Sequence, residues 1–212
     1  MVELASPFRC ATPADAPAMA ELVHFASEGL ALYLWTRMAG PGGDPWAVGR
    51  ERAEREQGGF SFRNTILIEL EGRVAAGLIG YPLPDTLDPP PDNPPAMFVP
   101  LNELEDLVPG TWYVNVLAAY PQHRGKGHGT ALLGVAEQLA RDTRRRGMSI
   151  IVADTNTGAR RLYERCGYRE VASRRMVKED WQHPGTNFVL LAKRLAEAGI
   201  RFQGSGIRDS GP

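Results

Sequence analysis

A glycine-rich turn between an apolar run and a long amphipathic run constrains the middle of this chain. Residues 124–129 read RGKGHG. Thr111–Ala119 before them is typical of a buried strand, and Thr130–Arg146 after them has helical periodicity. Glycine lets the backbone curl so that successive N–H groups converge, and the helix N-terminus adds partial positive charge. Arg124 and Lys126 add formal charge. The turn therefore predicts a phosphate or pyrophosphate site at the start of a helix.

Two common phosphate loops do not fit this turn. A P-loop needs Ser or Thr directly after its lysine, and Gly127 follows Lys126 here. A dinucleotide fingerprint needs the spacing G-x-G-x-x-G, and the third glycine, Gly129, comes one residue early. From these residues alone, a plain glycine-rich turn between strand and helix remains the alternative.

The other apolar and breaker patterns predict an α/β protein with a mixed sheet. Glu71-Gly72 is predicted to form a hairpin turn, and Gly147 to close the long helix. An apolar and aromatic stretch at 30–38 is left without an assigned element. We expect strands at 8–12, 65–69, 74–79, 111–119, 149–153, 169–177 and 188–191, and helices at 15–28, 44–58, 130–146 and 157–165.

Prolines crowd residues 82–100, where neither a central strand nor a helix is expected. We interpret this stretch as an extended surface excursion that either covers a ligand site or forms a contact in a homodimer. The end of the chain, Gln203–Pro212, is rich in small and breaker residues and is expected to fray.

Composition excludes some classes of function. The formal net charge is −1, which gives no general attraction to nucleic acid or to an anionic membrane. No apolar run approaches the roughly 18 residues of a membrane span. The two cysteines, Cys10 and Cys166, are far apart and indicate no disulfide framework. With no signal-peptide pattern, we expect a soluble cytoplasmic protein without nucleic-acid or membrane partners.

A second motif lies about 30 residues after the turn. Residues 156–168 read N-x-x-A-x-x-L-Y-E-x-x-G-Y. The two motifs together resemble the GNAT superfamily of acetyl-CoA-dependent N-acetyltransferases, whose first pattern is [QR]-x-x-G-x-[GA]. Arg124, Gly127 and Gly129 match this pattern, and Pro121 matches a preceding proline, although Ala119 replaces the usual branched residue. The order of elements agrees from about residue 65 to 191, and the specific motifs lie within 115–168.

The resemblance implies a fold and a domain layout. The fold is a mixed, mostly antiparallel central sheet flanked by helices. Residues 1–196 would form a single N-acetyltransferase domain in which 82–108 is a proline-rich insertion, and 197–212 would be a flexible tail.

The resemblance also implies a reaction, in which a neutral amine attacks the thioester of acetyl-CoA directly. Tyr163 would be the catalytic residue and would protonate the leaving thiolate. A backbone N–H near Leu117 would stabilise the oxyanion. Acetyl-CoA would be the co-substrate and a small-molecule or peptide amine the acceptor. The implied cofactor-binding residues are Leu117, Ala118, Ala119, Arg124, Gly125, Lys126, Gly127, His128, Gly129, Asn156 and Tyr163.

Simpler roles compete with these assignments. Outside its motif, Tyr163 would be a helix residue that packs its ring, and Asn156 would be a helix N-cap. His123 and His128 are interpreted as solvated loop residues, and no metal is expected. The arginines of 141–146 are interpreted as a solvated helix end.

Several questions stay open at this stage. The general base could be Asp154, a carboxylate of 103–106 (Glu103, Glu105 or Asp106) or water, and Glu28 could anchor a cationic acceptor. One alternative function is a non-catalytic acetyl-CoA sensor. Another is transfer of a longer acyl group, which depends on the space around Tyr81, Trp112 and Tyr113.

Overall fold

A seven-stranded sheet forms the centre of the molecule in the computed structural model, which describes residues 4–86 and 94–195. The strand order is β1-β2-β3-β4-β5-β7-β6, and every neighbouring pair is antiparallel except β4 and β5. The predicted mixed, mostly antiparallel sheet is therefore confirmed. The strands are β1 Phe8–Cys10, β2 Thr65–Leu70, β3 Arg73–Pro82, β4 Thr111–Ala119, β5 Gly147–Ala153, β6 Arg169–Arg175 and β7 Asn187–Arg194.

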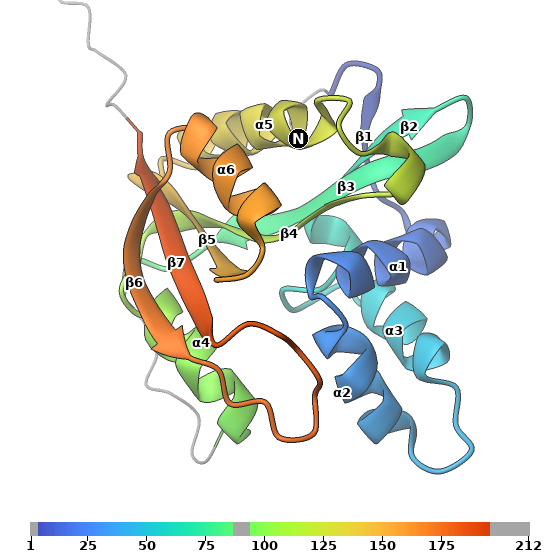
Figure 1. Cartoon of the computed structure of the whole chain (residues 1–212). Helices are drawn as coiled ribbons and strands as arrows, with labels where there is room; N and C mark the ends of the chain where they lie inside the picture. Colours follow the sequence, from blue (N-terminus) through green and yellow to red (C-terminus); the bar gives the residue numbers. More distant parts are fainter. Residues whose placement is uncertain (1–3, 87–93, 196–212) are drawn as a thin grey trace, which may run out of the picture.

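Helices cover both faces of this sheet (Figure 1). Successive strand residues point to opposite faces. In β2, Ile66 and Ile68 therefore pack in the cluster that includes α5, and Leu67 packs in the cluster of α1, α2 and α3. The helices are α1 Ala16–Ala26, α2 Leu30–Ala39, α3 Pro45–Ala53, α4 Val99–Glu105, α5 His128–Asp142 and α6 Thr157–Arg165. None of the described helices is long and apolar enough to cross a membrane.

The parallel pair β4–β5 separates halfway along its length. Its ladder runs from Thr111↔Gly147 to Val114↔Ile150 and ends there. Beyond this point β4 still pairs with β3 as far as Ala119, and β5 still pairs with β7 as far as Ala153. The second half of β4 consequently has unpaired backbone groups on one side, and an opening forms between two neighbouring strands of the sheet.

The long helix ends earlier than the sequence predicted. Helix α5 stops at Asp142, and Arg144 takes the left-handed conformation, with φ of 55°, that was expected of a glycine. The N–H of Arg145 then bonds the carbonyl of Ala140 at 2.8 Å, which closes the helix in the usual way. Gly147 is not the cap but the first residue of β5, so this expectation was wrong.

The proline-rich segment is not wholly a surface excursion. Residues 87–93 lie outside the described part of the chain, but its end folds back onto the sheet. Pro100 lies in the first turn of α4, where a helix needs no N–H. Met97 and Leu104 are buried in a cluster with β7. The predicted tail, 197–212, also lies outside the described residues.

Candidate active site

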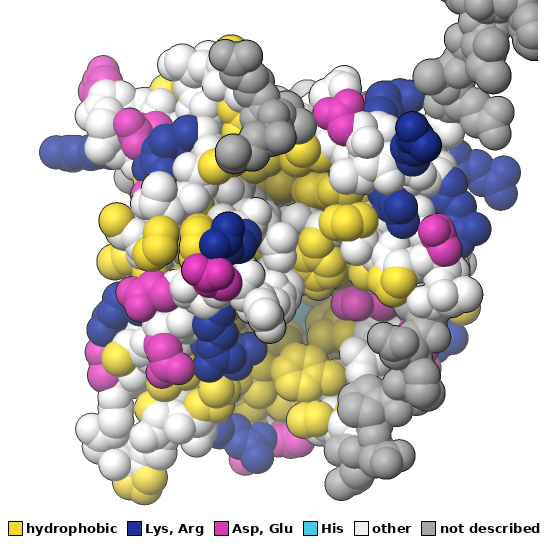
Figure 2. Space-filling view, turned by 180° about the vertical axis from the view of Figure 1, so that it is seen from behind, with side chains coloured by type: hydrophobic (Ala, Val, Ile, Leu, Met, Phe, Trp, Pro, Cys, Tyr) yellow, Lys and Arg dark blue, Asp and Glu magenta, His cyan; other side chains and the backbone are white. Residues whose placement is uncertain are grey.

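A cavity of about 750 Å³ opens where β4 and β5 separate. Its walls come from Asn115–Ala119 of β4, Ile150–Ala153 of β5, the α1–α2 loop and helix α6. Figure 2 shows hydrophobic side chains lining a hollow in the middle of the molecule, with charged groups around it. The cavity therefore combines an apolar lining with the free backbone edge of one strand.

The glycine turn lies directly before α5. Gly125 and Gly127 have φ of 72° and 85°, and a Cβ on either would meet nothing within 4 Å. Glycine is thus required at both positions by the backbone conformation and not by a lack of space. Gly129 differs, because its Cβ would lie 2.8 Å from Cδ2 of Leu162 in α6. The turn presents the N-terminus of α5 beside the cavity, with the exposed side chain of Lys126 nearby.

Arg124 lies against the end of β4. Its Nε donates a hydrogen bond to the carbonyl of Ala119 at 3.2 Å, and its guanidinium lies 5.7 Å from the ring centroid of Phe25. Since Arg124 also lines the cavity, it places positive charge at the end next to the glycine turn.

The two histidines of the turn are less solvated than the sequence suggested. The rings of His123 and His128 are 6.2 Å apart, and both are half-buried. The Nδ1 of His123 and the Nε2 of His128 are buried without a hydrogen-bond partner among the described residues. Burial, followed by the neighbouring His123 and Lys126, lowers the pKa of His128. His128 is therefore neutral at pH 7 and retains free hydrogen-bonding capacity beside the turn.

Asn156 and Tyr163 reach the cavity from α6. Asn156 caps this helix, because its Oδ1 accepts the N–H of Ala159 at 3.1 Å. Its amide nitrogen remains available on the cavity side. Tyr163 is buried and lines the same space, and no described residue hydrogen-bonds its hydroxyl. Burial, and then the charges of Cys166 and Glu28, raise the pKa of Tyr163 above that of a free tyrosine, so its hydroxyl stays protonated.

Two of the carboxylates considered as general bases have other partners. Asp154 accepts the backbone N–H groups of Thr186 at 3.0 Å and Asn187 at 2.9 Å. Burial opposes ionisation there, but these donors outweigh it and lower the pKa of Asp154. Glu103 pairs with Arg174 at 2.7 Å on the surface. Neither lines the cavity.

Glu105 does not line the cavity but is linked to it through Tyr113. Burial raises the pKa of Glu105 to about 6, partly offset by a hydrogen bond from the hydroxyl of Tyr113. Tyr113 is buried and lines the cavity; Tyr81 lies beside it with ring centroids 5.7 Å apart but is not among the described lining residues, nor is Trp112. Of the three positions considered for a longer acyl group, only Tyr113 therefore borders this space.

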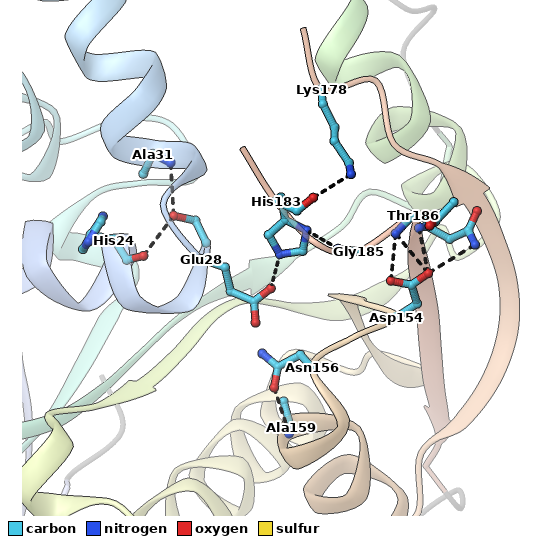
Figure 3. Close-up of polar contacts among 12 residues, drawn as sticks. His24, Glu28, Ala31, Asp154, Asn156, Ala159, Lys178, His183, Gly185 and Thr186 are labelled. Atoms are coloured by element: carbon cyan, nitrogen blue, oxygen red, sulfur yellow. Dashed lines mark hydrogen bonds and ion pairs between the residues drawn. The ribbon is translucent and has the colours of Figure 1, made fainter. Parts of the chain in front are cut away.

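The sequence did not point to His183, which lies in the loop between β6 and β7. Its Nε2 is 2.6 Å from Oε2 of Glu28 in the α1–α2 loop (Figure 3). The side chain of His183 is 3% exposed and that of Glu28 is 29% exposed. Glu28 lines the cavity, so the pair places a carboxylate at the cavity wall. No local pattern could reveal it, because 155 residues separate the two partners.

Comparisons with known proteins agree with this geometry. The model of the acetyltransferase (GNAT) family matches residues 30–168, more than half of the chain. A solved acetyltransferase is 19% identical with a TM-score of 0.61, covering 90% of this chain and 100% of its own. An N-acetyltransferase from Staphylococcus aureus Mu50 is 17% identical, with a TM-score of 0.58 and coverage of 87% and 98%.

A third structure, the ribosomal-protein-alanine N-acetyltransferase from Brucella melitensis, is 21% identical, with a TM-score of 0.51 and coverage of 89% and 99%. At such identities, structural likeness establishes the fold alone. A search of curated proteins found no match. The family match covers the turn, the opening between β4 and β5 and helix α6. This chain belongs to the GNAT family of acetyltransferases, and acetyl-CoA is its co-substrate.

Proposed function

We propose that this chain transfers the acetyl group of acetyl-CoA to a primary amine by direct attack in a ternary complex. One observation carries the proposal. The separation of β4 from β5 leaves the unpaired backbone of β4 and the ring of Tyr163 at a single cavity, and Arg124, the first residue of the glycine turn, lines the same space. A donor with a phosphate end and a reactive thioester end fits such a space.

The backbone supplies most of the donor site in this proposal. The free edge at Leu117, Ala118 and Ala119 pairs with the amides of the pantetheine arm, much as an added strand would. The pyrophosphate lies on the N–H groups of Gly125–Gly129, where the N-terminus of α5 favours negative charge. Arg124, Lys126 and His128 flank this end, and the free amide nitrogen of Asn156 donates to the arm.

The chemical step needs a proton donor near the sulfur. The neutral amine forms a bond to the thioester carbonyl carbon, and the carbon–sulfur bond breaks. The hydroxyl of Tyr163 gives its proton to the departing sulfur, and the nitrogen gives up its own proton to restore the neutral tyrosine. A backbone N–H near Leu117 stabilises the oxyanion. The raised pKa of Tyr163 keeps this group protonated at neutral pH, as an acid must be.

Calorimetric titration with acetyl-CoA, CoA and NADH tests the donor site. We expect micromolar binding of both CoA species and none of NADH. Gly127→Glu should abolish CoA binding, since it puts a negative charge and a side chain where φ is 85°. Gly134→Glu is the matched control, because Gly134 is exposed on the same helix with nothing within 4 Å of a Cβ.

Turnover is then followed as release of free thiol in the presence of primary amines. Binding without any thiol release would identify an acetyl-CoA sensor and overturn the enzymatic proposal. Failure to bind either CoA species would overturn the donor site as well.

A further inference from the structure

The backbone of the α1–α2 loop directs Glu28 into the cavity. Glu28 has φ of 50° and Gly29 has φ of 93°, so two successive residues are left-handed. This conformation is unfavourable for a residue that has a side chain. Gly29 also packs beneath the loop between β6 and β7, because its Cβ would lie 3.8 Å from Nε1 of Trp181. The loop thus holds a carboxylate at the cavity wall at some conformational cost.

His183 fixes the orientation of this carboxylate. The Nδ1 of His183 accepts the N–H of Gly185 at 3.0 Å, so the proton of the neutral ring lies on Nε2 and is donated to Glu28. The ring stacks on Trp181, with centroids 4.5 Å apart and planes at 25°. Lys178 donates to the carbonyl of His183 at 2.7 Å. Three interactions therefore hold the side chain of His183 and a fourth holds its backbone, although His183 does not itself line the cavity.

One oxygen of Glu28 is left for a ligand. His183 occupies Oε2, and no described residue hydrogen-bonds Oε1. Figure 3 shows the Glu28 carboxylate across from the Asn156 amide, on the side of the donor site. Glu28 and Tyr163 both line this cavity.

The rest of this end of the cavity is apolar. Among the described lining residues, the only charged side chains are Glu28 and Arg124, and Arg124 is held against Ala119 and the ring of Phe25. The surrounding walls are aliphatic and aromatic: Leu30, Leu34, Phe98, Leu101, Trp181 and Phe188. A second ammonium or a carboxylate on the acceptor would be buried against these apolar walls, which is strongly unfavourable for a charged group without a partner.

We propose that Glu28, positioned by His183, binds the ammonium of the acceptor, and that the acceptor is a monoamine with an apolar body. The inference rests on the proposed N-acetyltransferase function and names its substrate class. Oε1 of Glu28 contacts the ammonium and takes the proton that nitrogen must lose before it attacks. The ammonium thereby becomes a neutral amine, and the carboxylate a neutral carboxylic acid. The apolar walls reject diamines, amino acids and cationic peptides.

Two matched pairs of amines test the substrate class. Phenethylamine is compared with phenylalanine, which adds a carboxylate, and hexylamine with 1,6-diaminohexane, which adds an ammonium. We expect kcat/KM, measured by thiol release, to be at least about 100-fold higher for each monoamine, since a difference near 3 kcal/mol corresponds to that ratio. Equal or faster turnover of the doubly charged partners would overturn the inference.

Variants test the two residues separately. Glu28→Gln should lower kcat/KM for the monoamines by about 100-fold or more, and leave the affinity for acetyl-CoA unchanged in calorimetry. His183→Ala should raise KM for the amine by about 10-fold, and His183→Gln should restore part of this loss, because its amide can still donate to Glu28. Glu179→Gln is the control: it lies in the same loop and pairs with Arg37 outside the cavity.

The outcomes distinguish a failure of this inference from a failure of the proposed acetyltransferase function. Thiol release with diamines or peptides but not with monoamines leaves the enzyme in place and overturns the acceptor class. Full activity of Glu28→Gln overturns the role of Glu28. Acetyl-CoA binding without turnover of any of the four amines also overturns the inference, whereas a failure to bind acetyl-CoA removes the proposed function itself.

Discussion

The hydroxyl oxygens of Thr111 and Ser149 lie 2.7 Å apart in a buried hydrogen bond between β4 and β5. Thr111 also donates to the carbonyl of Val108 at 2.8 Å, so its single proton is used and Ser149 must be the donor in the pair. The bond lies in the half of the two strands that remains paired, between the first residue of the β4 ladder and the partner of Tyr113 in β5. It therefore helps to hold together the paired half of the two strands, beyond which the proposed donor site opens.

This arrangement predicts unequal costs for removing the two hydroxyls. Ser149→Ala removes only a donor and should lower the free energy of unfolding by about 1 kcal/mol. Thr111→Val leaves both the Ser149 hydroxyl and the Val108 carbonyl without a partner, so we expect a loss of about 2–3 kcal/mol. Urea denaturation measures both values. The reverse order would contradict the donor assignment.

Tyr163→Phe should lower kcat by about 100-fold or more, because the departing thiolate loses its proton donor. The affinity for acetyl-CoA, measured by calorimetry, should stay nearly unchanged. Tyr168→Phe is the matched control, since the rings of Tyr168 and Tyr163 are 5.9 Å apart, and the sulfur of Met148 is the only hydrogen-bond partner of the Tyr168 hydroxyl among the described residues. Weaker acetyl-CoA binding with unchanged kcat in Tyr163→Phe would contradict the general-acid role.

Glu105→Gln should make the protein more stable at neutral pH. Burial raises the pKa of Glu105 from 4.5 to about 6 in the folded chain. Between these values the folded state holds a proton that the unfolded state has lost, so the stability of the native protein falls as pH rises from 4.5 to 6. A difference of this size corresponds to at most about 2 kcal/mol above pH 6.

Denaturation at a series of pH values measures this effect. The glutamine can still accept the hydrogen bond of Tyr113. Because it does not ionise, it should remove the fall in stability with rising pH that Glu105 causes. Glu103→Gln, on the exposed side of the same helix, should leave the decline in place. A Glu105→Gln protein that is less stable than the native protein at pH 7 would show that the charged carboxylate is needed in the fold.

Asp154→Asn should retain most of kcat. The carboxylate of Asp154 holds the N–H groups of Thr186 and Asn187, and an asparagine oxygen can still accept one of them. We expect a rise in KM for the amine, because the loop that carries His183 becomes less firmly held. A fall in kcat of about 100-fold at unchanged KM would instead identify Asp154 as the general base.

Local patterns predicted the elements on which the donor site depends. Thr111–Ala119 and Thr157–Arg165 agree residue for residue with the structure, because one is a sustained apolar run and the other has Asn156 as its cap. The start of the long helix was predicted correctly near the glycine turn. Its end was not, because Arg144 adopts the left-handed conformation that was expected of Gly147. The sequence contains no feature that marks arginine for this role.

Other features depend on contacts distant in the sequence. Helix α2 was not predicted because its N-cap residue is the left-handed Gly29, which has no side chain to mark the start of a helix. Helix α4 was not predicted because it begins within the proline-rich stretch. The separation of β4 from β5 and the pairing of Glu28 with His183 depend on how strands and loops meet in space, and neither leaves a local signal.

The β4–β5 ladder ends at Val114, and different chemical groups make up the proposed donor and acceptor sites beyond it. Main-chain atoms, which every amino acid carries, make up the proposed donor edge, so that half of the site tolerates substitution as long as the strands stay apart. The proposed acceptor end depends on side chains from two loops outside the sheet, those of Glu28 and His183. Substitutions in these two loops could therefore change the acceptor during evolution, while the fold and the acetyl donor stay the same.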